Sequence, residues 1–282
     1  MSFSLLTDAR SFLFVPGNRP ERFDKALASQ ADVVIVDLED AVPVADKAAA
    51  RVALALAWNQ WPTAQRARVV VRINAAQTDS HPDDLSWLAQ LPGLPAVMLP
   101  KAEKTSDLMG VQDALGEAAT ALIPIIESAE GLANVDTLAR CPRVLRLAFG
   151  HLDFQADLGM ACGTDEAELA SVRVAIAVAS RRAGLVAPID GVTTDTQDMS
   201  RVQTDAARSL RFGFGAKLCI HPLQVVAVHA AFIPSAAQIE WAQRVLQAEA
   251  AAGGSAFTVD GRMVDPPVLK LARQCLAMAR LG

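Results

Sequence analysis

Short, continuously apolar runs alternate along this chain with longer segments in which apolar side chains recur every three or four positions. Apolar runs of about four to eight residues, bounded by turn residues, are typical of strands that are buried on both faces in a parallel sheet. The longer segments have the spacing of amphipathic helices, as for Val202, Ala206 and Leu210. The pattern therefore predicts an α/β chain of repeated strand–helix units.

Eight such units can be counted. The predicted strands are residues 11–15, 33–38, 69–73, 96–99, the run from 121 that ends before Glu127, 144–149, 187–189 and 216–220. The predicted helices between and after them are residues 20–30, 46–58, 83–90, 106–119, 166–183 and 196–212. Eight βα units in one chain favour a (β/α)8 TIM barrel, and the alternative is an open doubly wound sheet.

The C-terminal part departs from this repeat, and we assign residues 1–234 to a catalytic barrel and 235–282 to a helical and lid extension. The extension is predicted to contain, in order, a helix over 235–252, a flexible joint at Gly253-Gly254-Ser255, a hairpin or lid over 256–265 that turns at Asp260-Gly261, and a last helix from Pro266 to Leu281. Since a barrel is complete without it, we expect the extension to pack between subunits, to close the active site, or both.

The amino-acid composition argues against some classes of binding partner and cell location. The chain has 282 residues, 52% of them hydrophobic, and a net charge of −5, which argues against general nucleic-acid binding. The first ten residues lack the features of a signal peptide, and no apolar run approaches the roughly 20 residues of a membrane span. The cysteines show no zinc-site spacing, so we expect reduced thiols and a cytoplasmic location. They are Cys141, Cys162, Cys219 and Cys275.

Two acidic side chains follow successive predicted strands. Glu127 ends the run that starts at Ala121, and Asp153 comes directly after the next apolar run and Gly150. About one helix and one strand separate them, which would place both carboxylates on neighbouring strand ends. Mg²⁺ is usually held by one or two carboxylates together with water. The alternative is that each acid caps the helix that follows it.

Other charged and polar residues follow the remaining predicted strands, where a TIM barrel carries its active site. A mixture of acids and guanidinium groups on one face suits an anionic substrate that a metal ion and arginine hold together. These residues are Arg19, Lys25, Glu39, Asp40, Arg72, Asn74, Lys101 and His221.

Eight stretches in this order resemble one known family, the acyl-CoA lyases related to the citrate lyase beta subunit within the HpcH/HpaI-type aldolases. They are RSFLFVPGNRPERFDKA from Arg10, ADVVIVDLEDAV from Ala31, VVRIN from Val70, LPK from Leu99, IPIIESAEG from Ile123, LAFGHLDFQADLG from Leu147, GFGAKLCIHPLQV from Gly213 and GRMVDPP from Gly261. The family includes malyl-CoA and citramalyl-CoA lyases.

The resemblance implies a role for each matching residue. It makes Glu127 and Asp153 the ligands of Mg²⁺, with Mn²⁺ as the alternative ion, and Arg72 the group that stabilises the substrate carbonyl and enolate. Glu39 and Asp40 match acids that bind waters of the metal. The family's CoA-binding positions correspond to Phe14, Arg19, Lys25, Ile220 and His221.

Each of these roles has a structural alternative. Phe14 and Ile220 suit plain core packing, and Arg19 and Lys25 suit a solvated helix face. Arg72 could form an ion pair between strands. His221 precedes Pro222 and could orient the backbone rather than act in acid–base chemistry. His151 is expected in a loop of varying composition, where it could influence substrate preference.

Asp265 matches an aspartate that, in free-standing members of the family, reaches the active site of a neighbouring subunit. That role implies a homo-oligomer, and the resemblance indicates a trimer or a hexamer. The alternative role for Asp265 is to cap the last helix, and both roles are compatible.

The resulting hypothesis is a magnesium-dependent lyase that cleaves a 3-hydroxy-3-carboxyacyl-CoA of malyl, citramalyl or citryl type into acetyl-CoA, or a homologue, and a 2-oxo acid. Three alternatives remain open: the lyase subunit of a citrate lyase that works with an acyl carrier protein, a thioesterase for malyl-CoA-type substrates, and a non-catalytic CoA-binding protein.

Overall fold

The structure is a computed structural model that describes residues 4–252 and 257–279. The chain divides into two compact units, Met1–Val228 and His229–Gly282. The sequence placed this boundary between residues 234 and 235, six residues later. Each unit is described separately below.

The first unit contains a closed barrel in which eight parallel strands pair in sequence order, β1 to β8, and β8 pairs with β1. This confirms the predicted TIM barrel. The strands are β1 (Ser11–Pro16), β2 (Val33–Asp37), β3 (Val69–Arg72), β4 (Ala96–Leu99), β5 (Ala121–Ile126), β6 (Ala148–Phe149), β7 (Ile189–Asp190) and β8 (Ala216–Cys219).

The strands form because their side chains are apolar on both faces, one directed to the barrel interior and one to the surrounding helices. All five residues of β2 and all six of β5 are buried. The interior is filled by alternate residues of successive strands, with the small Ala148 and Ala216 on either side of the larger Ile189. It includes Phe12, Val33, Ile35, Val70, Met98, Ile123, Ile125, Ile189 and Leu218.

The sixth strand is shorter than the predicted 144–149. Val144 forms only an isolated bridge to Leu122, and regular pairing begins at Ala148. Arg146 lies between them and is fully buried, where it donates through Nη1 to the carbonyls of Leu6 and Ala9 at 3.1 Å each. The guanidinium needs several carbonyl acceptors, and backbone outside regular strand pairing supplies them. This explains why the strand is interrupted around Arg146.

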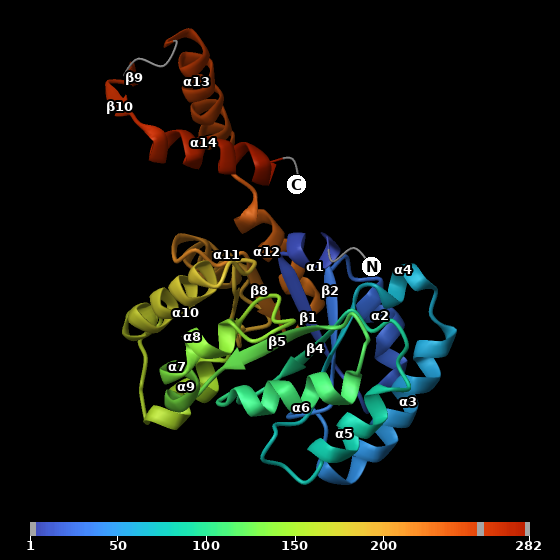
Figure 1. Cartoon of the computed structure of the whole chain (residues 1–282). Helices are drawn as coiled ribbons and strands as arrows, with labels where there is room; N and C mark the ends of the chain where they lie inside the picture. The colour runs from blue at the N-terminus through green and yellow to red at the C-terminus, as the bar shows by residue number, and fades with distance from the viewer. Residues whose placement is uncertain (1–3, 253–256, 280–282) are drawn as a thin grey trace. The chain divides into compact units, whose positions relative to one another are not determined.

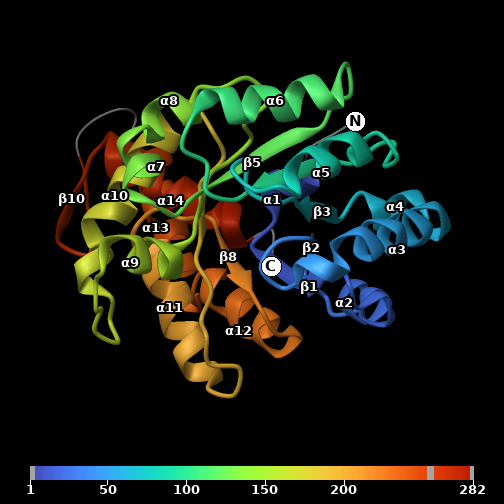
Figure 2. The same cartoon turned by 90° about the horizontal axis from the view of Figure 1, so that it is seen from below.

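Most of the helices of this unit lie outside the strands, as Figure 2 shows, and Leu6 of the short first helix packs into the barrel core. Figure 1 labels most of them. They are α1 (Ser4–Asp8), α2 (Phe23–Leu27), α3 (Lys47–Gln60), α4 (Thr63–Arg66), α5 (His81–Leu88), α6 (Thr105–Leu115), α7 (Ala129–Ala133), α8 (Val135–Ala139), α9 (His151–Leu158), α10 (Ala170–Arg182), α11 (Met199–Arg211) and α12 (Pro222–Phe232), with short 3₁₀ turns at Pro20–Arg22, Val44–Asp46 and Ala167–Leu169.

The second unit comprises α13 (Ala236–Ala252), the strands β9 (Phe257–Val259) and β10 (Arg262–Val264), and α14 (Pro266–Ala279). The two strands pair antiparallel, and the turn between them is at Asp260-Gly261, as predicted. Both turn residues have positive φ, 51° and 74°, which is the backbone of a tight hairpin turn. The predicted joint at Gly253-Gly254-Ser255 and the helix end at Leu281 lie outside the described residues.

One helical stretch among the described residues, Pro222–Ala251, is long and apolar enough to cross a membrane by length and composition, with a mean hydropathy of 1.3. The sequence pattern did not predict such a stretch. Core helices of water-soluble proteins meet the same criterion, and α12 and α13 are separate helices within it, so the finding is weak support for a membrane span.

Candidate active site

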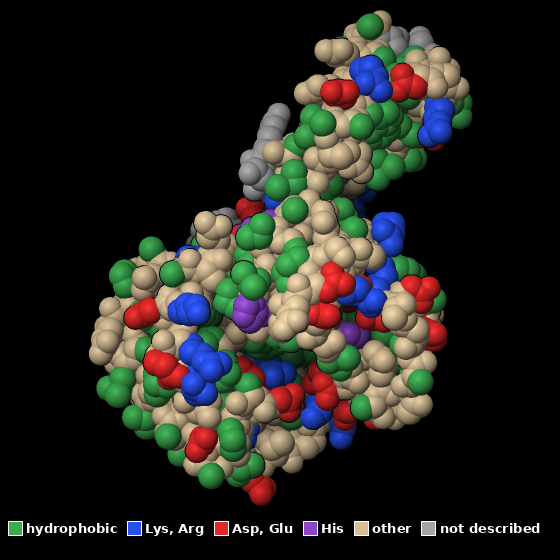
Figure 3. Space-filling view, turned by 180° about the vertical axis from the view of Figure 1, so that it is seen from behind, with side chains coloured by type: hydrophobic (Ala, Val, Ile, Leu, Met, Phe, Trp, Pro, Cys, Tyr) green, Lys and Arg blue, Asp and Glu red, His purple; other side chains and the backbone are tan. Residues whose placement is uncertain are grey.

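A pocket of about 360 Å³ lies in the first unit where the barrel strands end. Figure 3 shows a hollow in this unit around which acidic and basic side chains gather. We call this the acid pocket. Its lining comprises Phe14, Asp37, Asp40, Ala41, Arg72, Ile125, Glu127, Phe149, Gly150, His151, Leu152, Asp153, Val192, Leu218 and Ile220.

The structure brings the two predicted metal ligands into this pocket. Glu127 follows β5 directly and is 5% exposed, and Asp153 lies in the first turn of α9. The Glu127 carboxylate accepts a hydrogen bond from the backbone N–H of Lys101 at 2.7 Å, which fixes one of its oxygens. A Cβ at Gly150 would overlap the Glu127 carboxylate, so only glycine leaves room for that side chain.

The acid pocket brings several carboxyl groups together, and two of them, Glu39 and Glu127, are largely shielded from solvent. Burial raises the pKa of Glu127 to about 8, and the carboxylates of Glu39 and Asp153 act in the same direction. Burial also raises the pKa of Glu39 to about 7, although the charge of Arg72 opposes this. Carboxylates that repel one another in a buried site are stabilised by a bound cation.

The carboxylates of this pocket suit a hard cation that keeps some coordination positions open for water or substrate. Within residues 4–252 and 257–279, no group of three or more His, Cys, Asp and Glu side chains is arranged to hold a metal ion. Glu127 and Asp153 therefore offer two carboxylates at an open pocket rather than a closed protein cage. Such sites suit Mg²⁺, which usually keeps several water or substrate ligands.

Arg72 ends β3 and lines the same pocket. It donates through Nε and Nη2 to the two carboxylate oxygens of Asp37, each at 2.7 Å, and its Nη1 lies 2.7 Å from Glu39 Oε2. Its guanidinium also lies over the ring of Phe14, 4.8 Å from the centroid. This bidentate arrangement fixes the plane and position of the guanidinium.

Asp37 is a residue that the sequence analysis did not single out. It is buried at the end of β2, and its carboxylate also accepts the backbone N–H groups of Glu39 at 2.9 Å and Ala41 at 3.0 Å. One side chain thus positions both Arg72 and the loop that carries Glu39. The available signal was its place as the first acid of the DLED motif, next to the two acids that were chosen.

A buried lysine supports the same loop. Lys47 in α3 donates to the carbonyls of Leu38 at 2.8 Å and Glu39 at 3.0 Å, and to Asn74 Oδ1 at 2.5 Å. Asn74 is held in turn by Asp84, which accepts both its backbone and side-chain N–H at 2.7 Å. These bonds tie the loops after β2 and β3 together, so Glu39 stays beside Arg72.

The two predicted acids of that loop differ in their surroundings. Glu39 is buried, pairs with Arg72 and has Lys101 Nζ at 3.8 Å. Asp40 lines the pocket, but its side chain is exposed and its Oδ2 is 3.6 Å from Arg72 Nη1. Both lie near the carboxylate pair, and their role as partners of metal-bound water remains a prediction.

The residues predicted to hold CoA separate into two groups. Phe14 and Ile220 line the acid pocket, and Ile220 is 40% exposed, which is unlike plain core packing. Arg19 and Lys25 lie outside the pocket on the exposed surface, where Arg19 donates to Glu21 at 2.6 Å. His221 accepts the backbone N–H of Leu223 at 3.2 Å through Nδ1, so it orients the start of α12.

Asp265 belongs to the second unit and precedes α14. Its Oδ1 accepts the backbone N–H of Val268 at 3.2 Å, which is the helix-capping role that the sequence allowed. Its catalytic role at the site of a neighbouring subunit remains a prediction.

His151 requires a correction. The sequence pattern predicts a loop of varying composition here, whereas the structure buries His151, 4% exposed, as the first residue of α9. Burial lowers the pKa of its imidazole. Gly191 makes room for the ring, since a Cβ there would overlap Nδ1. The side chain lines the acid pocket beside Asp153.

Known proteins resemble this chain over nearly its whole length. The chain is 38% identical over 277 residues to a citrate lyase subunit beta-like protein of Deinococcus radiodurans, covering 95% of this chain and 96% of that protein. It is 32% identical to a (3S)-malyl-CoA thioesterase of Cereibacter sphaeroides, covering 96% and 94% of the two chains.

Among solved structures, the fold matches CitE from Mycobacterium tuberculosis in complex with magnesium, acetoacetate and coenzyme A. The TM-score is 0.85 at 36% identity, and the match covers 97% of this chain and 99% of that one. The family model described as HpcH/HpaI aldolase/citrate lyase matches residues 10–222, which span the barrel and its strand-end residues. This chain therefore belongs to the HpcH/HpaI aldolase/citrate lyase family.

Proposed function

We propose that the protein is a magnesium-dependent carbon–carbon lyase that cleaves a 3-hydroxy-3-carboxyacyl-CoA into acetyl-CoA, or a homologue, and a 2-oxo acid. One observation carries the proposal: Glu127, Asp153 and the fixed guanidinium of Arg72 line a single pocket. The complex of its structural neighbour with magnesium and coenzyme A supports the same ligands for this chain.

Glu127 and Asp153 would hold the metal ion. When bound, Mg²⁺ supplies Lewis-acid chemistry that polarises substrate oxygens. The backbone N–H of Lys101 keeps the Glu127 carboxylate in place, and Gly150 leaves room for it.

Arg72 stabilises the negative charge that develops on the thioester oxygen when the carbon–carbon bond breaks. Asp37 holds the guanidinium in a fixed plane before the substrate arrives, so little reorganisation is needed during the reaction. The electron pair of the broken bond enters the thioester enolate, and a proton then returns to that carbon to give the acyl-CoA product.

Asp265 of a neighbouring subunit would accept the proton of the substrate hydroxyl as that oxygen becomes the carbonyl of the 2-oxo acid. The role requires a homo-oligomer, for which a trimer or a hexamer is our proposal. Phe14, Arg19, Lys25, Ile220 and His221 would contact the CoA part. We further propose a cytoplasmic enzyme.

Product analysis by mass spectrometry tests the function. The purified protein is incubated with Mg²⁺ and, separately, with malyl-CoA, citramalyl-CoA and citryl-CoA, with EDTA as the metal-free control. We expect acetyl-CoA together with glyoxylate, pyruvate or oxaloacetate, formed only when metal is present. No acetyl-CoA from any of the three would reject these substrates.

Substitutions of the two carboxylates test where the metal ion binds. Glu127→Gln and Asp153→Asn each remove one charged ligand and should lower kcat/KM by about 10³-fold or more, since metal charge stabilisation contributes several kcal/mol. Asp113→Asn is the control, because Asp113 is an exposed acid of α6 outside the pocket. Equal activity of all three variants would contradict the assignment of the metal ligands.

A thioesterase is the second candidate, favoured by the 32% identical malyl-CoA thioesterase. It would give free CoA and malate where the lyase gives acetyl-CoA and glyoxylate, so the same assay separates the two reactions. A citrate lyase subunit would require a substrate bound to an acyl carrier protein. A non-catalytic protein would bind CoA without turnover.

A further inference from the structure

A second pocket of about 380 Å³ adjoins the acid pocket. The two share three lining residues, His151, Leu152 and Val192. We call the second one the side pocket, and its lining also includes Gln155, Glu166, Thr193, Thr194, Arg201 and Asp205. A molecule in the acid pocket that extends past His151 would therefore enter the side pocket.

His151 is a buried side chain that lines both pockets and has a long ion-pair contact with Glu166. Among the described residues its ring forms no hydrogen bond, and Nε2 lies 3.7 Å from Glu166 Oε1, which is too long for one. The ring nitrogens are not among the fully buried polar atoms that lack a partner, so water or a ligand in the pockets can reach them. A ligand group placed between the two pockets would supply the missing partner.

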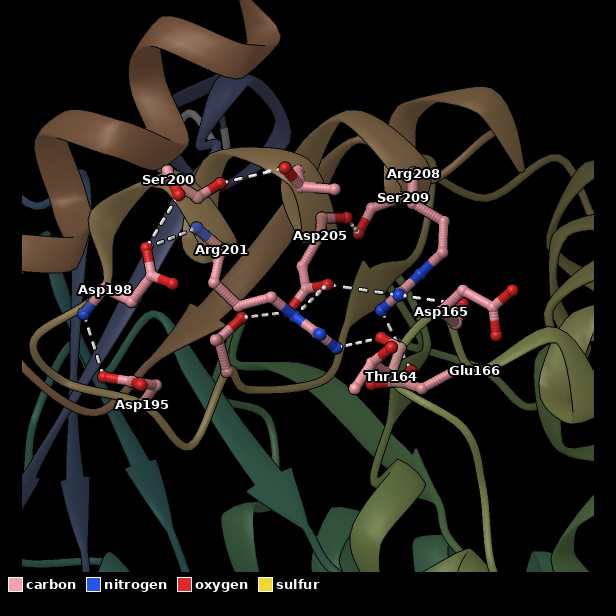
Figure 4. A network of polar contacts seen from close by, with 12 residues as sticks. Thr164, Asp165, Glu166, Asp195, Asp198, Ser200, Arg201, Asp205, Arg208 and Ser209 are labelled. Carbon is pink, nitrogen blue, oxygen red and sulfur yellow. Dashed lines mark hydrogen bonds and ion pairs between the residues drawn. The ribbon is translucent and has the colours of Figure 1, made fainter.

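The charged groups behind the side pocket are already paired, as Figure 4 shows for several of them. Glu166 Oε2 accepts hydrogen bonds from Arg173 and from Arg208, the latter at 2.9 Å. Arg201 donates to Asp205 Oδ2 at 3.1 Å and to the carbonyl of Thr164. The guanidinium groups are thus engaged with the protein itself.

One acceptor atom of the lining, Glu166 Oε1, is left without a hydrogen bond among the described residues, since it has only the distant His151 ring. Asp205 Oδ1 is fully buried, with Arg201 Nε at 3.0 Å and Arg208 Nη1 at 3.1 Å, so a molecule in the pocket does not reach it. An unsatisfied acceptor favours a ligand that carries a donor. A carboxylate would meet the Glu166 carboxylate there, and a methyl group would leave Oε1 unpaired.

We propose that the side pocket binds the distal end of the 2-oxo acid part of the substrate, that this end carries a hydroxyl group, and that His151 and Glu166 contact it. The inference rests on the lyase function proposed above and names its substrate class. In the reverse reaction, the acetyl methyl carbon loses a proton and bonds to the keto carbon, and the keto oxygen takes up a proton as the new hydroxyl. No group is oxidised or reduced.

Condensation kinetics test the substrate class. The enzyme with Mg²⁺ and acetyl-CoA is given glyoxylate, pyruvate, 3-hydroxypyruvate or oxaloacetate. We expect kcat/KM for 3-hydroxypyruvate to exceed that for pyruvate by about tenfold or more, since a matched polar contact contributes about 1 to 3 kcal/mol. His151→Ala should lower this ratio about tenfold, mostly through the KM for 3-hydroxypyruvate.

Two further variants keep the test decisive if His151→Ala is unstable. Thr194→Trp fills the side pocket from its exposed rim and should also lower the ratio. Leu158→Ala is the matched control, because Leu158 is an exposed residue of the same helix, α9, outside both pockets. It should leave the ratio unchanged.

A binding measurement separates this inference from the proposed reaction. In protein with ¹³C-labelled histidine, the four imidazole signals can be followed by NMR, and the signal of His151 is the one lost in His151→Gln. We expect 3-hydroxypyruvate, but not pyruvate, to shift it. A shift without any condensation would refute the lyase and leave the subsite standing. Preference for pyruvate or oxaloacetate, with no shift and an unchanged ratio in the variants, would overturn the subsite.

Discussion

Magnesium affinity should depend strongly on pH, because the metal must displace a proton from Glu127. Burial and the carboxylates of Glu39 and Asp153 raise the pKa of Glu127 to about 8 in the metal-free protein. The ionised fraction is then about one half at pH 8 and about 1% at pH 6. Since only the carboxylate binds metal, the apparent Kd for Mg²⁺ should rise about 50-fold between pH 8 and pH 6.

The same pKa fixes the sign of the stability change. A carboxyl group whose pKa is raised on folding stabilises the metal-free protein fully below its unfolded value of 4.5, and this stabilisation is lost as pH rises through about 8. Added Mg²⁺ acts in the opposite sense. The rise in Tm on adding Mg²⁺ should therefore be larger at pH 8 than at pH 6.

Isothermal titration calorimetry measures both the affinity and the protons released. Titrations in two buffers of different ionisation enthalpy should give about one proton released at pH 6 and about half of one at pH 8. Glu39→Gln removes a charge that raises the pKa of Glu127, so the transition should move to lower pH. An apparent Kd that is equal at pH 6 and pH 8 would refute the reasoning, since Glu127 would already be ionised at pH 6.

Three further substitutions test single contacts. Asp37→Asn removes the carboxylate that holds Arg72 and should lower kcat about 100-fold with little change in Mg²⁺ affinity. Steady-state kinetics measure kcat and calorimetry measures the affinity. An unchanged kcat would contradict the role of Asp37 in positioning Arg72. Gly150→Ala places a Cβ against the Glu127 carboxylate and should abolish Mg²⁺ binding while the circular dichroism spectrum stays native; retained binding would contradict it. Arg146→Ala leaves the buried carbonyls of Leu6, Ala9 and Ala187 without their donor and should lower the free energy of unfolding in urea by about 3 kcal/mol or more. A loss below about 1 kcal/mol would show that these carbonyls find other partners.

The barrel could be predicted because its signals are local. Strand β2 is buried throughout and apolar in its first four residues, and the residue pair Asp260-Gly261 predicts the turn of the β9–β10 hairpin. The place of Glu127 and Asp153 in one pocket could be predicted because the residues that follow parallel strands gather at one end of a barrel. No information about distant contacts was needed for any of these.

Asp37 and His151 could not be placed in this way, because their roles depend on the register between strands and on helix packing. Asp37 and Arg72 are direct partners across β2 and β3, which is known only once the two strands are aligned. Within its own segment, Asp37 is one acid among three. His151 faces Glu166 and Gly191, which belong to segments far along the chain.

The side pocket lies where the barrel ladder is shortest. Strands β6 and β7 have two residues each, and buried polar contacts hold the loops where backbone pairing ends. Asp190 accepts hydrogen bonds from Arg173 at 3.1 Å and Ser209 at 2.6 Å, and Lys217 donates to the carbonyl of Gly191 at 2.6 Å.

Buried ion pairs of this kind add little net stability, because desolvation offsets their attraction. These ion pairs do fix the positions of the groups that they join. Glu127 stands instead at the end of a six-residue strand, where it accepts a hydrogen bond from the backbone of Lys101. Asp153 lies in the first turn of α9, the helix that His151 begins. Substitutions of His151 should therefore disturb the position of Asp153 more than that of Glu127, and comparing Mg²⁺ affinity in His151→Ala and in the control Leu158→Ala would show whether the two carboxylates can be altered separately.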